Sequence, residues 1–175
     1  MKILAVIATS LLFAGPVFAQ SVGEKSGVYP ALGVSPSTAD FVKEAAISDM
    51  FEIQSSQLAA QRANEPTKAF ASQMITDHQK TASELKSMVQ SGKTDASAPS
   101  DLDSSHQKML DKLKGLNGAD FTKQYCKDQV SAHKDAVSLF QRYAKGGDNA
   151  ALKDWAEKTF PDLEQHLQMA QDLYK

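Results

Sequence analysis

The pattern of helix breaks constrains this 175-residue chain more than any other feature. Capping and helix-breaking residues divide it into segments with helical periodicity, and no segment alternates apolar and polar residues as a strand does. The sequence therefore predicts an all-α fold. Four long helices are expected, at about residues 37–63, 66–91, 119–145 and 149–174.

The lengths of the connections indicate how these helices are arranged. About three residues join the first helix to the second, and about three join the third to the fourth, so each pair is expected to form an antiparallel hairpin. Residues 92–118 separate the pairs and contain a short amphipathic helix at 104–114. One long crossover of this kind is the ferritin-like arrangement of a four-helix bundle. An up-down-up-down bundle with a disordered loop is the alternative.

Two details are expected in the fourth helix. Asp148 is a natural N-cap residue and is predicted to begin the helix. Pro161 lies inside the helical pattern, where it removes a backbone hydrogen bond, and it predicts a kink or a break at Phe160.

The start of the chain is typical of an exported protein. Residues 1–19 combine a positive charge, a short apolar run and small residues before a cleavage position, as a signal peptide does. Residues 20–35 are rich in glycine and predict a flexible leader, and 36–175 form the expected bundle domain. An uncleaved N-terminal anchor is disfavoured because the apolar run is short. We expect export, with the periplasm as the compartment, and no transmembrane segment after cleavage.

Charge and cysteine content exclude some classes of protein. A formal net charge of -2 gives no electrostatic reason to expect nucleic acid or anionic lipid as a partner. Cys126 is the only cysteine and falls on the apolar side of its helix, so it predicts a small buried side chain. The chain contains no serine elbow, phosphate loop or paired-cysteine motif. Neither a protein partner nor an oligomeric state is indicated.

Four polar residues occupy the apolar faces of four different helices, near the middle of each: Glu52, His78, His133 and His166. A leucine at these positions would cost less to bury. In a bundle, inward side chains at one level converge. The sequence therefore predicts a buried site made of one glutamate and three histidines.

This set of ligands suits Zn, Fe, Mn, Cu or Ni and does not suit Ca or Mg. Asp77 and Asp162 are candidates for outer partners that orient the ligands, because Asp162 lies four residues before His166. Two alternatives remain open. The four residues form a metal-free network in which Glu52 stabilises protonated imidazoles, or they do not converge.

The remaining histidine and the methionines carry less information. His106 lies near the start of the short helix with no ligand spacing around it, and is expected at the surface. Met74 and Met169 lie close in sequence to His78 and His166, which keeps copper open as the metal. At helical spacing, core packing is the more ordinary role of methionine.

The chain resembles the exported domain-of-unknown-function 4142 family in the segments FVKEAAISDMFEIQSSQLA, KAFASQMITDHQKTASEL, QVSAHKDAVSLF and FPDLEQHLQMA. The resemblance covers about residues 39–174 and implies a ferritin-like four-helix fold. Members are often labelled predicted outer-membrane proteins. The resemblance puts the characteristic polar positions of the family at Glu52, Asp77, His78, His133 and His166.

The chain departs from di-iron ferritin-like sites, which use four carboxylates and two histidines supplied by Glu-x-x-His motifs. It contains no Glu-x-x-His motif and only one clear inward carboxylate. The sequence therefore disfavours ferroxidase activity and iron storage as functions of this chain.

Three classes of function follow. We expect a non-enzymatic exported bundle of unknown biochemical role with a candidate transition-metal site in its core, and we favour a binding or stress-protective role in the envelope. The rival is a metalloenzyme acting on peroxide or superoxide, which requires an open coordination position reached by a channel. The third is a structural or interaction module with a metal-free polar core, which an exposed apolar patch would indicate.

Overall fold

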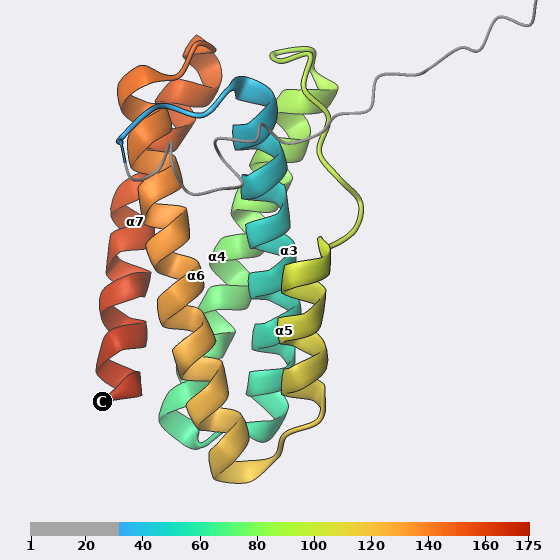
Figure 1. The fold of residues 1–175 in the computed structure, drawn as a ribbon, viewed down its shortest axis with the longest axis vertical. Helices are drawn as coiled ribbons and strands as arrows, with labels where there is room; N and C mark the ends of the chain where they lie inside the picture. Colours follow the sequence, from blue (N-terminus) through green and yellow to red (C-terminus); the bar gives the residue numbers. More distant parts are fainter. Residues whose placement is uncertain (1–31) are drawn as a thin grey trace, which may run out of the picture.

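Helices account for most of the part of the chain that the computed structural model describes, residues 32–175, and this part contains no strand (Figure 1). The predicted all-α fold is therefore confirmed. The predicted signal peptide and most of the predicted leader fall outside the described residues. The helices are α3 (Thr38–Arg62), α4 (Glu65–Gln90), α5 (Ser104–Lys114), α6 (Gly118–Gly146) and α7 (Ala150–Tyr174).

The crossover determines the topology. Short turns join α3 to α4 and α6 to α7, and each pair forms an antiparallel hairpin (Figure 1). From the end of α4 the chain returns along the bundle through residues 91–103 and α5, and α6 begins at the opposite end (Figure 1). As a result α4 and α6 run in the same direction. The predicted long crossover with its short helix is confirmed, and the up-down-up-down alternative is wrong. This connectivity is typical of ferritin-like bundles.

Side-chain caps set where the helices begin. The backbone N–H of Asp40 donates to Ser37 Oγ at 3.1 Å at the start of α3, and Asn64 caps α4 in the same way. At the start of α5, the N–H of His106 donates to Asp103 Oδ1 at 2.8 Å. These bonds satisfy backbone donors that have no partner inside the helix.

The fourth long helix differs from the prediction in two details. Its N-cap is Asn149, whose Oδ1 accepts from the N–H of Leu152 at 3.0 Å. The prediction of Asp148 is wrong because the hydroxyls of Thr38 and Tyr143 donate to that carboxylate instead.

The helix also runs without interruption through Pro161, so the predicted break at Phe160 does not occur. Ala156 and Leu163, on either side of the proline, are both buried in the same apolar cluster. Packing on both sides therefore outweighs the lost backbone hydrogen bond.

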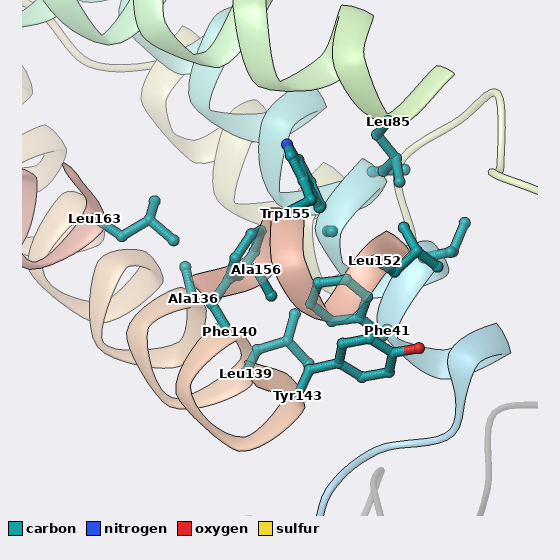
Figure 2. Close-up of a cluster of buried hydrophobic side chains, with 13 residues drawn as sticks. Phe41, Leu85, Ala136, Leu139, Phe140, Tyr143, Leu152, Trp155, Ala156 and Leu163 are labelled. Atoms are coloured by element: carbon teal, nitrogen blue, oxygen red, sulfur yellow. The ribbon is translucent and has the colours of Figure 1, made fainter. Parts of the chain in front are cut away.

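The apolar core is divided into two clusters along the bundle. The first cluster includes Phe41, Phe140, Tyr143, Leu152 and Trp155 (Figure 2). The second cluster includes Ala59, Phe70, Met74, Phe121 and Tyr125. On every long helix, the level between the two clusters carries a buried polar side chain: Glu52 on α3, His78 on α4, His133 on α6 and His166 on α7.

No helix within residues 32–175 is both long and apolar enough to cross a membrane. This agrees with the expectation for the chain beyond its first segment.

Candidate metal centre

Three buried histidines meet between the two clusters. The ring centroids of His78 and His133 are 5.6 Å apart, those of His78 and His166 are 5.7 Å apart, and those of His133 and His166 are 5.5 Å apart. Each ring offers one nitrogen, and these nitrogens all lie within 4.8 Å of one another. Three of the four side chains predicted from the sequence therefore converge at one point.

Each imidazole is held from outside by its other nitrogen. His78 Nδ1 lies 2.8 Å from Asp49 Oδ1, and His166 Nε2 lies 2.9 Å from Asp77 Oδ2. His133 Nδ1 lies 3.0 Å from the carbonyl oxygen of Gln129. A carbonyl only accepts, and so does an ionised carboxylate, so these three nitrogens act as donors.

The inner nitrogens are the atoms left over: His78 Nε2, His133 Nε2 and His166 Nδ1. All three are buried and have no hydrogen-bond partner among residues 32–175. In a neutral imidazole that donates through one nitrogen, the other carries a lone pair. The site therefore directs three unpartnered ring nitrogens into one small volume, and each carries a lone pair when its ring is neutral. Metal-bound histidines are typically oriented in this way by outer partners.

The electrostatics of the site favour neutral imidazole at two of the three rings. Burial, followed by the charge of His78, lowers the pKa of His133 well below its usual value, and the same causes lower the pKa of His166. Burial also lowers the pKa of His78, but the hydrogen bond to Asp49 and the charge of Glu52 outweigh it, so this pKa is raised overall. Neutral imidazole is the form that binds a metal.

Glu52 lies beside the three histidines and outside the group of converging donors. Its Oε1 is 3.7 Å from His133 Nδ1, which is the outer nitrogen of that ring. Burial raises the pKa of Glu52 to about 7, against the opposing charge of His78. A hydrogen bond from the Gln129 side chain also opposes this shift of the pKa. Glu52 is therefore a buried carboxyl group beside the histidines, and it is not one of the converging donors.

Of the two predicted outer partners, only one contacts a histidine ring. Asp77, on α4, reaches across to His166 on α7. Asp162 is exposed on α7, and its influence on His166 is a charge effect that raises the pKa of the ring. The outer nitrogen that Asp162 was expected to hold is already bonded to Asp77.

Sequence reasoning missed Asp49 and Gln129. Asp49 is buried on α3, and its Oδ1 also accepts from the Thr81 hydroxyl at 2.7 Å. Its spacing of three residues before Glu52 puts both acids on one face, a signal that was present in the sequence. Gln129 acts through its backbone carbonyl, which leaves no signal in the sequence.

The structure also places His106, Cys126 and the two methionines for which the sequence made predictions. His106 is partly buried, with its ring 5.3 Å from that of Phe51, so the surface prediction is wrong. The ring faces α3 because α5 packs on that helix. Cys126 is buried and free, as predicted. Met74 is buried in the second cluster, and Met169 packs against it.

A pocket opens onto the histidines from one side. It has a volume of about 300 Å³ and lies between α4 and α7. Both His78 and His166 contribute to its wall, together with Asp77, Thr81, Thr159 and Asp162.

The chain is therefore a small helical bundle with a long crossover, and its three convergent buried imidazoles form a candidate metal centre. The sequence matches the profile of the family described as "Domain of unknown function (DUF4142)" over residues 24–173. The chain belongs to this family, and the resemblance drawn from its sequence is confirmed.

One solved structure shares the fold. It is described as "CopM in the Cu(II)-bound form", and it superposes with a TM-score of 0.66 at 17% sequence identity. The match covers 81% of this chain and 97% of CopM. No curated protein matches the sequence.

Proposed function

We propose that this protein binds one transition-metal ion between His78, His133 and His166. A single observation carries the proposal: three buried imidazoles direct unpartnered nitrogens toward one point. Burying such acceptors without a donor or a ligand costs about 1–3 kcal/mol each. One ion satisfies all three together.

The distances require only a small adjustment for ligation. The three donor nitrogens lie within 4.8 Å of one another. Two nitrogens bound to one ion at about 2.1 Å lie at most about 4.2 Å apart. Ring shifts of under about one ångström therefore bring the donors into bonding range.

The chemistry favours a late first-row metal. The donors are imidazole nitrogens, while Asp49, Asp77 and Glu52 stay on the outer side of the rings. Imidazole suits Zn, Cu, Fe and Ni, and Cu(II) binds nitrogen ligands most tightly in the divalent series. The solved structure of CopM, which shares the fold, is in the Cu(II)-bound form. Cu(II) is therefore the metal that we propose.

A metal-free network explains the same residues less well. Such a network requires a proton on at least one inner nitrogen so that the rings hydrogen-bond to one another. Burial opposes a second proton on His133 and on His166, so only His78, whose pKa is raised, can carry it. Moreover, the centroids of the rings are 5.5–5.7 Å apart and no hydrogen bond joins any pair of them within the described residues.

Export, expected from residues 1–19, would put the site in the cell envelope. We propose a role in binding or sequestering a metal there, where a loosely bound redox-active ion is damaging. The pocket beside His78 and His166 is the observation that favours a metalloenzyme as the second candidate, since three protein ligands with an open position are typical of catalytic metal sites. Consumption of peroxide or superoxide by the metal-loaded protein, lost in His78→Ala, would support that candidate.

Elemental analysis of the purified protein tests the proposed function. We expect about one equivalent of metal in the wild type after Cu(II) loading and desalting, and a loss of most of it in His78→Ala because only two donors remain. His106→Ala is the matched control, because His106 lies outside the site and should retain the metal. Equal metal content in the His78→Ala and His106→Ala proteins would contradict the proposal.

A further inference from the structure

We propose that the metal reaches and leaves the three histidines through the pocket between α4 and α7, whose wall includes His78, His166 and the Asp77 carboxylate that bonds to His166. The inference rests on the proposed function. It adds the route, which the convergence of the histidines does not specify.

The packing leaves the α4–α7 side as the open approach. Two of the three ligands, His78 and His166, are part of the wall of the pocket. On α3, Glu52 and the nearby Phe51 and Ser55 are all buried, so this helix exposes none of these groups to solvent. Along the bundle axis, the two apolar clusters lie above and below the site. A hydrated ion crosses neither cluster without losing its water, which is costly.

The charges on the pocket wall suit a cation. Three carboxylates and two lysines contribute to it: Asp77, Glu84, Asp162, Lys80 and Lys158. Acidic groups beside a low-dielectric wall raise the local concentration of a cation and increase its association rate. A volume of about 300 Å³ holds a metal ion together with its water shell or a small carrier ligand.

Asp77 connects the pocket to the ligands. Its side chain is 38% exposed while its Oδ2 bonds to His166 Nε2. Asp49 plays the same part for His78, but its side chain is only 8% exposed. The two aspartates hold ligand rings in the same way, and Asp77 is the one of the two that also lines the pocket.

The test is kinetic and compares two exposed lysines. Lys158 is part of the pocket wall on α7, whereas Lys134 lies on α6 next to His133 and is part of a different pocket. Cu(II) loading and its removal by a coloured chelator are followed by absorbance in wild type, Lys158→Trp and Lys134→Trp. Both substitutions remove one charge and add the same bulk, so only the position differs.

We expect Lys158→Trp to slow loading and removal by on the order of tenfold each, with unchanged affinity, because it obstructs the path without altering a ligand. Lys134→Trp should keep wild-type rates. Lys158→Ala, which removes the charge and leaves the pocket open, should load at least as fast as wild type.

Equal rates in the Lys158→Trp, Lys134→Trp and wild-type proteins would overturn the route while leaving metal binding intact. Slowing by both tryptophan variants would overturn it too. A wild-type protein that takes up no Cu(II) at equilibrium would remove both the route and the proposed function.

Discussion

Cu(II) at a thousandfold excess over its dissociation constant raises the free energy of unfolding of the wild-type protein by about 4 kcal/mol, and His133→Ala abolishes this rise. The ion binds where three helices bring their donors together, and that arrangement exists only in the folded state. His133 is the ligand from α6, so without it only α4 and α7 supply nitrogen donors. Denaturant unfolding followed by circular dichroism, with and without Cu(II), measures the effect.

The free energy of unfolding is compared with and without Cu(II) for each variant separately, so differences between the metal-free proteins do not enter the result. His133→Ala also leaves a cavity in a buried region, so its metal-free form will be less stable than the wild type. The predicted quantity is the difference that Cu(II) makes to one and the same variant. His106→Ala should retain the full rise. If His133→Ala gained as much stability from Cu(II) as the wild type does, the ion would be bound elsewhere.

The second large effect is a dependence of stability on pH that arises from Glu52. Burial raises the pKa of this carboxyl from 4.5 to about 7 in the folded protein. The folded state therefore holds the proton more tightly than the unfolded state does. Ionising the group costs stability as pH rises from about 4.5, and the cost is complete above about 7. At 1.36 kcal/mol for each pKa unit, the full cost is about 3 kcal/mol.

Glu52→Gln should therefore be close to the wild type in stability near pH 4.5 and more stable by about 3 kcal/mol at pH 8, in the absence of metal. Burial lowers the pKa of His133 and of His166, so both reduce stability as pH falls in either protein. His78 is coupled to Glu52, whose charge raises the pKa of His78, so part of the difference between the two proteins reflects His78. Urea unfolding at several pH values provides the measurement. An exposed counterpart, Glu157→Gln, should show no such trend. A difference that stays constant with pH would mean that the pKa of Glu52 is the same in the folded and unfolded states, and would contradict the prediction.

Much of the fold was accessible from the sequence because its signals are local. The residues that break and cap helices lie next to the boundaries that they set, as Ser37 and Asn64 do. The topology followed from the lengths of the connections, because only the segment between α4 and α6 is long enough to run the length of the bundle. Pro161 shows the limit of such signals. The cost of a proline inside a helix is local, but the packing that offsets it is not.

The three histidines were predictable for a related reason. Each lies on an apolar face that is well defined by its neighbours on one helix, and helix periodicity then fixes its direction. The first long helix, α3, has apolar residues nearly all round, so its inner face was the least certain. There the prediction chose Glu52 and missed Asp49, although both are buried.

The outer partners could not be assigned from the sequence because they depend on how the helices are placed against one another. Asp162 was favoured for His166 since both lie on α7, one turn apart. The ring instead turns toward α4 and takes Asp77 as its partner. The tautomer of each imidazole follows from these contacts, so the directions of the three lone pairs emerge only from the folded structure.

A crystal structure of the Cu(II)-loaded protein, with anomalous diffraction collected at the copper edge, tests the central claim most directly. We predict one strong peak, about 2.0–2.1 Å from His78 Nε2, His133 Nε2 and His166 Nδ1. The outer hydrogen bonds to Asp49, Asp77 and the Gln129 carbonyl should persist. Copper bound only at surface residues, with the three rings as they are without it, would contradict the account.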